Sequence, residues 1–374
     1  MARGRAVPIP ILKSALLVPP LLRWFARHAR ELPWRRTRDP YAVWISEIML
    51  QQTQVSTVIP YWTRWMRELP DVRALAAAPA ERVLKLWEGL GYYTRARNLQ
   101  RAAQLIVGRP DRSFPRRFEE ILALPGIGRY TAGAISSIAF HQPHPILDGN
   151  IIRVLTRLFC IAGEPREKQT NALLWQLAEE LVTRAGPRRC SALNQSLMEL
   201  GALVCTPRQP RCEACPLRNL CIAFRSGRVA ELPNLAPRPP ATARRVIAFV
   251  IERDARFIVR QRPAGTVNAQ LWEFPNVDTS LLNGAAAADW LRDKFRIRAR
   301  TLTSLGEIRH SITRYRIVIE TLHVLPSRAE AARLSGETWL PFAQLDALAL
   351  ASAHRKILES LQRIRGELVL NFEL

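Results

Sequence analysis

The sequence predicts a two-domain protein in which an all-α domain is followed by a smaller α+β domain. A length of 374 residues is enough to build two hydrophobic cores. Up to residue 224, apolar residues recur with helical spacing between Pro and Gly turns. From residue 246 onward, short segments alternate apolar and polar residues, as strands do. A proline-rich stretch separates the two patterns.

The first part of the chain is a series of amphipathic segments. Alternating segments are nearly absent there, so we assign residues 1–231 to a single helical domain. Helices are expected at residues 41–55, 80–90, 95–107, 113–122, 130–139, 151–159, 168–181 and 190–200.

The second part begins after a predicted linker at residues 232–245, where prolines interrupt a stretch without apolar periodicity. Residues 246–374 are expected to form the α+β domain. Its strands are expected at residues 246–251, 256–260, 308–324 and 337–340, and its helices at residues 285–295 and 353–362.

The charge balance indicates a polyanionic partner. The chain has 55 Lys+Arg against 32 Asp+Glu, a formal net charge of +23. This excess excludes a typical acidic enzyme of small-molecule metabolism. It favours a protein that binds a phosphate backbone, because Lys and Arg release condensed counterions there. No segment resembles a membrane span or an export signal. We expect a cytoplasmic, nucleoid-associated monomer in a reducing compartment, where clustered cysteines usually bind metal.

Four cysteines lie close together in a loop-rich segment: Cys205, Cys212, Cys215 and Cys221. Four thiolates can surround Zn2+ or an iron–sulfur cluster. Zinc sites usually contain two CxxC pairs, whereas only one is present here. The spacing therefore favours a [4Fe–4S] cluster, with zinc and four free thiols as alternatives.

Residues 124–135 combine the end of one expected helix, a turn with Gly126 and Gly128, and the start of another helix. This helix-hairpin-helix pattern brings backbone N–H groups and a positive helix N-terminus close to a phosphate. Alone it would be read as an ordinary turn. Beside the basic excess and the cysteine loop, it indicates binding to a DNA backbone.

Two carboxylates lie where they could take part in chemistry. Asp148 follows the hairpin helix, and either caps the next helix or faces a sugar and stabilises positive charge at C1′. Glu47 shares a helical line with Gln51. It is either a solvated surface residue or an acid desolvated by Trp44 and Leu50, with a raised pKa.

Together these motifs closely resemble the adenine DNA glycosylase family, also called MutY, within the endonuclease III-like glycosylases. The matching runs span the first domain in order, at residues 32–35, 44–54, 89–98, 124–135, 147–150 and the cysteine loop. The resemblance implies base excision repair of double-stranded DNA, in which adenine mispaired with 8-oxoguanine or guanine is removed. It also implies a [4Fe–4S] cluster held by the four cysteines.

The resemblance assigns a role to each matching residue. Glu47 would be the general acid that protonates N7 of adenine, and ionised Asp148 would stabilise or trap the oxocarbenium-like sugar. Bifunctional relatives carry a lysine nucleophile where this chain has Tyr130, so a monofunctional enzyme is expected. Tyr130 and Asn150 match residues that orient Asp148. The residues implied to contact DNA are Trp34, Arg35 and Gln195 at the adenine, Gln52 and Tyr92 beside 8-oxoguanine, and Gly126 and Gly128 at the backbone.

The second domain resembles the family's C-terminal domain, a relative of the Nudix hydrolase fold, through residues 270–275. A working Nudix hydrolase needs a Glu-rich helix for Mg2+, and the corresponding helix here has only Asp289 and Asp293. We therefore expect recognition of 8-oxoguanine rather than nucleotide hydrolysis.

One motif departs from the family. Most members carry Phe-Ser-His where this chain, aligned in register, has Ile312, Thr313 and Arg314. Thr313 and Arg314 are then the residues expected at 8-oxoguanine, and a shifted alignment puts His310 there instead. The alternatives to the adenine glycosylase are an endonuclease III-like glycosylase of other base specificity, a bifunctional lyase, a Nudix-type hydrolase, and a non-catalytic, redox-responsive iron–sulfur protein that binds DNA.

Overall fold

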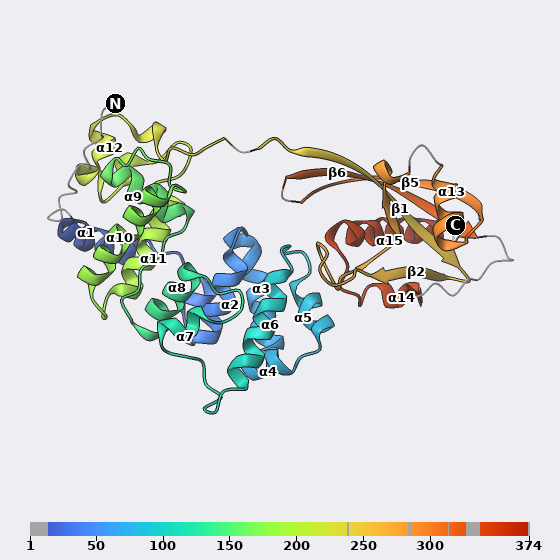
Figure 1. The fold of residues 1–374 in the computed structure, drawn as a ribbon, viewed down its shortest axis with the longest axis horizontal. Coiled ribbons are helices and arrows are strands. Elements are labelled where there is room, and N and C mark those ends of the chain that lie inside the picture. The colour runs from blue at the N-terminus through green and yellow to red at the C-terminus, as the bar shows by residue number, and fades with distance from the viewer. Residues whose placement is uncertain (1–13, 238, 283–285, 313, 327–336, 373–374) are drawn as a thin grey trace. The chain divides into compact units, whose positions relative to one another are not determined.

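The computed structural model describes all residues except 1–13, 238, 283–285, 313, 327–336 and 373–374 (Figure 1). The chain divides into two compact units. Unit 1 comprises the residues up to Ala77 and Asn98–Pro237, and unit 2 comprises Ala78–Arg97 and Arg238–Leu374. Residues 78–97 thus pack with the C-terminal part of the chain, although their sequence pattern places them among the helices of the first half.

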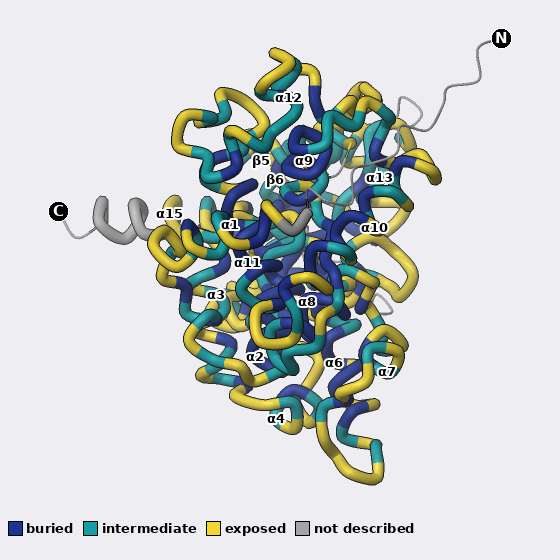
Figure 2. The backbone as a smooth tube through the Cα atoms, turned by 90° about the vertical axis from the view of Figure 1, so that its left-hand side faces the viewer, coloured by how far each residue is buried: buried dark blue, intermediate teal, exposed yellow. Residues whose placement is uncertain are grey.

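Unit 1 is helical. Its helices are α1 (Ser14–His28), α2 (Pro40–Leu50), α3 (Val55–Glu68), α4 (Val72–Ala77), α6 (Thr94–Val107) from Asn98 onward, α7 (Phe118–Leu122), α8 (Arg129–Phe140), α9 (Gly149–Phe159), α10 (Lys168–Ala185), α11 (Cys190–Leu203) and α12 (Ile222–Arg225). α11 is central, since it packs against α1, α8, α9 and α10. Its buried Leu193, Leu197 and Leu200 belong to the same core as Ile151 and Leu155 of α9. Figure 2 shows buried stretches of these helices alternating with exposed ones, as amphipathic segments require.

Two expected helices of unit 1 are corrected by the structure. The helix expected at residues 41–55 ends at Leu50, because Gln52 takes a left-handed backbone conformation (φ 58°), and α3 begins at Val55. Only the last turn of the segment expected at 113–122 is helical, as α7. The sequence patterns did not predict α1, which contains Pro19 and Pro20.

Unit 2 consists of a mixed sheet with helices on both faces. Its elements are α5 (Ala80–Trp87), β1 (Thr242–Arg253), β2 (Arg256–Gln261), β3 (Trp272–Glu273), β4 (Asn276–Asp278), α13 (Ala287–Phe295), β5 (Ala299–Ile312), β6 (Tyr315–Pro326), β7 (Glu337–Pro341), α14 (Phe342–Leu345) and α15 (Ser352–Phe372). The strand order is β3-β2-β1-β6-β5, with β4 paired to β1 and β7 to β2. β1 and β6 run parallel, and the other pairs are antiparallel.

Successive side chains of β1 point to opposite faces of the sheet, and each face packs against a different helix of unit 2. Ala248 and Val250 pack in the core that includes Ile357 of α15. Phe249 and its neighbours on the opposite face pack with Leu291 of α13. The long strand expected at residues 308–324 is in fact a hairpin of β5 and β6, with Ile308 opposite Ile319. None of the described helices is long and apolar enough to cross a membrane.

Candidate active site and iron–sulfur centre

A cavity of about 470 Å³ opens in unit 1 between α2, α8, α9 and α11. Its volume lies in the range of small-molecule pockets. The cavity is lined by both predicted catalytic carboxylates, Glu47 and Asp148, together with Tyr130 and Asn150. Four residues scattered over more than 100 positions of sequence thus meet in one place.

Glu47 is buried in the last part of α2, with 5% of its surface exposed. Its Oε2 accepts a hydrogen bond from the hydroxyl of Tyr130 at 2.9 Å. Burial raises the pKa of Glu47 to about 7, the nearby Asp148 adds to this effect, and the Tyr130 hydrogen bond and the Arg35 charge oppose it. At neutral pH, a large fraction of Glu47 therefore keeps its proton, as a general acid requires.

Asp148 is both a helix cap and a cavity residue. Its Oδ1 accepts the backbone N–H of Ile151 at 2.8 Å and so caps α9, and its Oδ2 accepts from Asn150 Nδ2 at 2.9 Å. Burial raises its pKa, while these hydrogen bonds lower it. Asp148 therefore caps α9 and also lines the cavity, while its predicted action on a sugar stays a prediction.

Tyr130 and Asn150 differ in what they orient. Asn150 contacts Asp148 directly, as the resemblance implied. Tyr130 donates to Glu47 instead, at the position where a bifunctional relative would carry lysine. Burial, with the Glu47 and Asp148 charges, raises the pKa of Tyr130 well above 10, so its hydroxyl stays protonated.

Trp34, Arg35, Gln52 and Gln195 line the same cavity. Glu199, a further acid in this cavity, was not among the site residues predicted from the sequence. Burial alone would raise its pKa, but hydrogen bonds from Arg30 and Arg35 lower it to about 2. The sequence did hold a signal for it, because Glu199 follows Gln195 by four residues and so shares its helix face.

Arg153, also not predicted, links the active site to the cysteine loop. Its Nη2 donates to Asn150 Oδ1 at 2.8 Å, and its Nε donates to the carbonyl of Cys205 at 2.6 Å. Gly201 makes room for this arrangement, since a Cβ there would lie 2.7 Å from the Asn150 Cβ. A hydrogen-bonded chain therefore runs from Asp148 through Asn150 and Arg153 to the cysteine loop.

The four predicted cysteine ligands line one largely apolar cavity beside α9, α11 and α12. The buried guanidinium of Arg157 donates to Cys205 Sγ at 3.4 Å. Within the described ranges, no three His, Cys, Asp or Glu side chains lie close enough to hold a single metal ion. Thiolates are the ligands of iron–sulfur clusters, and these four thiols line one cavity, as ligands of a single cluster must. These thiols therefore fit a [4Fe–4S] cluster, which draws its ligands from Cys205, Cys212, Cys215 and Cys221.

The predicted hairpin is formed by α7, a turn and α8. Gly126 needs to be glycine for two reasons: its φ is 79°, and a Cβ would lie 2.7 Å from the Asn98 Cβ. Gly128 is the N-cap residue of α8. Both glycines are exposed at the positive end of α8, where an anion is stabilised.

In unit 2, a second cavity of about 270 Å³ is lined by Tyr92 and by His310, Ser311 and Ile312 of β5. Tyr92 is 46% exposed. Thr313 lies outside the described residues. Arg314 is not among the lining residues, and its guanidinium lies over the Tyr315 ring, 5.3 Å from the centroid.

Family models match the chain in three places. Residues 45–180 match the HhH-GPD superfamily of base excision DNA repair proteins. Residues 205–221 match the iron–sulfur binding domain of endonuclease III, and residues 246–360 match the NUDIX domain. The first two matches coincide with the catalytic cavity and the cysteine loop.

Curated relatives extend this similarity to most of the chain. The adenine DNA glycosylase of Mus musculus is 35% identical over 394 residues, covering 90% of this chain and 76% of the relative. The chain belongs to the adenine DNA glycosylase family. The human member is also 35% identical, with 90% of this chain and 72% of the relative covered. The member from Buchnera aphidicola (Schizaphis graminum) is 34% identical, with 82% and 85% covered.

Two solved structures resemble part of the chain. A thermostable thymine-DNA glycosylase matches with a TM-score of 0.52 and 30% identity, covering 57% of this chain and 98% of that one. A non-covalent endonuclease III–DNA complex matches with a TM-score of 0.50 at 22% identity, which shows a shared fold, over 59% and 99% of the two chains. This member of the family is thus a base excision repair enzyme that acts on DNA, and its cofactor is a [4Fe–4S] cluster.

Proposed function

We propose that this enzyme is a monofunctional glycosylase that hydrolyses the N-glycosidic bond of adenine paired with 8-oxoguanine or guanine. The observation that carries the proposal is the pairing of Glu47, with a pKa of about 7, and Asp148 in one cavity.

The chemistry follows from the two environments. Adenine leaves poorly as an anion, so protonation of its N7 by Glu47 lowers the barrier to bond cleavage. As the sugar gains positive charge, Asp148, held by Ile151 N–H and Asn150, stabilises it from a fixed position. Glu47 has then lost its proton and activates the water that completes hydrolysis.

Monofunctional action is supported by Tyr130. A lyase reaction needs a nucleophilic amine near C1′ to form an imine. Where bifunctional relatives carry that lysine, this chain has Tyr130, a phenol with a raised pKa that donates to Glu47. Excision should therefore leave an intact abasic site.

Recognition of the opposite base is assigned to the cavity of unit 2. 8-Oxoguanine differs from guanine by an oxygen at C8 and a hydrogen on N7. Burial and the charge of Lys356 lower the pKa of His310, so its ring is neutral at pH 7 and able to accept that hydrogen. Tyr92 supplies an exposed aromatic face for stacking.

The test is single-turnover excision on duplexes that hold adenine opposite 8-oxoguanine, guanine or thymine. We expect strand breaks only after alkali, the fastest rate opposite 8-oxoguanine, and no product with Glu47→Gln. Borohydride should trap no protein–DNA adduct. An adduct would refute monofunctional action, equal rates opposite 8-oxoguanine and guanine would refute the specificity, and absence of abasic sites would refute adenine excision.

A further inference from the structure

The loop between α5 and α6 is held in an unusual backbone conformation. Gly89, Gly91 and Tyr92 all have positive φ, at 100°, 68° and 46°. For tyrosine this left-handed conformation costs free energy, so surrounding contacts must hold it. Within the loop, the indole N–H of Trp87 donates to the carbonyl of Gly91 at 3.0 Å, and Arg95 donates to the carbonyl of Leu90 at 3.1 Å.

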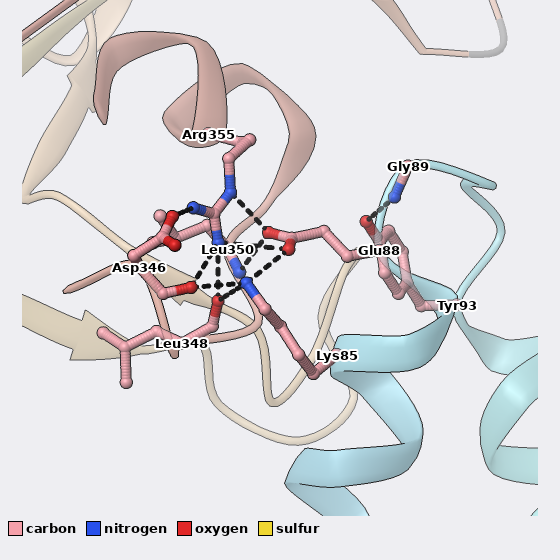
Figure 3. A network of polar contacts seen from close by, with 8 residues as sticks. All are labelled: Lys85, Glu88, Gly89, Tyr93, Asp346, Leu348, Leu350 and Arg355. Atoms are coloured by element: carbon pink, nitrogen blue, oxygen red, sulfur yellow. Dashed lines mark hydrogen bonds and ion pairs between the residues drawn. The ribbon is translucent and has the colours of Figure 1, made fainter. Parts of the chain in front are cut away.

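Glu88, which immediately precedes this loop, is fixed by residues more than 260 positions further on. Figure 3 shows its carboxylate facing Arg355, which donates from Nε at 2.9 Å and from Nη2 at 3.1 Å. The backbone N–H of Leu350 and the ammonium of Lys85 also donate to it, at 2.9 and 2.8 Å. The side chains of Glu88 and Arg355 are only 13% and 16% exposed, which strengthens a two-pronged ion pair.

Arg355 and Lys85 also bind the segment before α15. Arg355 donates to the carbonyl of Leu348 at 2.8 Å and to the carboxylate of Asp346 at 2.7 Å. Lys85 donates to the same Leu348 carbonyl at 3.0 Å. The network thus joins α5 to the start of α15 (Figure 3).

A second contact holds the loop on the C-terminal side of Tyr92. Arg97, in the first turn of α6, donates to the carbonyl of Ala269 at 2.7 Å. The loop that carries Tyr92 is therefore hydrogen-bonded to residues 238–374 on both sides of Tyr92, through Glu88 before it and Arg97 after it. Ser352, the first residue of α15, lines the cavity beside Tyr92, only three positions from Arg355.

We propose that the Glu88–Arg355 pair is a positioning device that holds Tyr92 at a fixed distance from Ile312 and His310, and so sets how well the enzyme distinguishes the base opposite adenine. The inference rests on the proposed function, because it assigns Tyr92 and β5 to reading that base. Glu88 and Arg355 are positioning residues, since they act through the loop. The carboxyl chemistry in unit 1 does not involve them.

The test compares Arg355→Gln with Arg363→Gln. Arg363 lies on the same helix, is exposed and donates to Ser360 one turn earlier, so it serves as the matched control. Replacing Arg355 removes two charge-assisted hydrogen bonds to Glu88, and we expect the ratio of single-turnover rates opposite 8-oxoguanine and guanine to fall roughly tenfold. The rate opposite guanine should change by less than about twofold. Arg355→Lys should restore part of the ratio.

Hydrogen exchange of the amides at residues 89–93 in the cluster-loaded free protein gives a second readout. Exchange should accelerate in Arg355→Gln and stay unchanged in Arg363→Gln. Glu88→Gln, which keeps the Leu350 hydrogen bond, should shift exchange and rate ratio in the same direction even if Arg355→Gln folds poorly. Unchanged exchange, or equal loss of rate opposite both bases, would overturn the proposal. A wild-type protein that excises no adenine would instead refute the proposed function, and the exchange result would still decide whether the pair holds the loop.

Discussion

Replacement of Glu47 by glutamine should make the protein more stable while abolishing excision. The pKa of about 7 lies about 2.5 above the ordinary value of 4.5. One pKa unit corresponds to about 1.4 kcal/mol, so ionised Glu47 costs the folded state about 3 kcal/mol at pH 8. Glutamine has nearly the same shape, carries no charge, and can still accept the Tyr130 hydroxyl through its amide oxygen.

The sign of the effect depends on pH. Between pH 4.5 and 7 the folded state binds more protons at Glu47 than the unfolded state does, so wild-type stability falls as pH rises through this window. The gain from Glu47→Gln should therefore grow from about 1 kcal/mol at pH 5.5 to about 3 kcal/mol at pH 8. Urea unfolding of the cluster-loaded protein at these two pH values measures the difference.

Glu199→Gln is the matched control from the same cavity. Its pKa is lowered to about 2, so its charge stabilises the folded state above pH 4.5, and its replacement should destabilise the protein at pH 8. A Glu47→Gln variant that gains no stability, or gains the same amount at both pH values, would refute the assignment of a buried acid with a raised pKa.

Other predictions concern the reaction, the cluster and DNA binding. The excision rate should fall as pH rises through about 7, where Glu47 loses its proton, and should also fall in acid as Asp148, with a pKa above its ordinary value, is protonated. Asp148→Asn should reduce excision roughly 100- to 1000-fold in single-turnover assays while the unfolding free energy changes by less than about 1 kcal/mol, because Asn caps helices as well as Asp does. Cys215→Ser should remove the visible absorbance of the cluster and lower the melting temperature, since the cysteine loop would lose the group that it surrounds. Affinity for duplex DNA should decline steeply with salt on a log–log plot, given a net charge of +23; a flat dependence would show that the basic excess does not contact phosphates.

Local signals made most of the fold and the centre of the site predictable. The helices of unit 1 follow from their apolar period, and the cysteine loop follows from one run of spacings. Asp148 and Gly126 were predictable because their roles depend on neighbours within a few residues. Asp148 caps α9 by accepting the N–H of Ile151, and Gly126 forms a turn with positive φ.

The features that were missed depend on contacts distant in sequence. Arg153 donates hydrogen bonds to the carbonyls of Cys205 and Gly201, about 50 residues away, and the hydrophobic periodicity of the sequence does not predict such contacts. The helix expected at residues 80–90 forms as α5 and ends at Trp87. Its place within unit 2 involves the contact of Glu88 with Arg355, more than 260 residues further along. Pattern reasoning identifies an element and its buried face, but it does not identify the element that covers that face.

The two buried acids of the catalytic cavity show how one fold gives the same side chain opposite properties. Both glutamates are almost fully buried, Glu47 at 5% and Glu199 at 1% exposure. Glu199 receives hydrogen bonds from two guanidinium groups, which outweigh desolvation and keep it ionised. Glu47 receives a hydrogen bond from one neutral hydroxyl, and the Asp148 charge raises its pKa more than the Arg35 charge lowers it, so desolvation prevails and its proton is retained. Hydrogen bonds from arginine therefore decide whether a buried glutamate is ionised, as Glu199 is, or keeps a proton to donate, as Glu47 does. Introducing a guanidinium that donates to Glu47 should lower its pKa and remove its function as an acid.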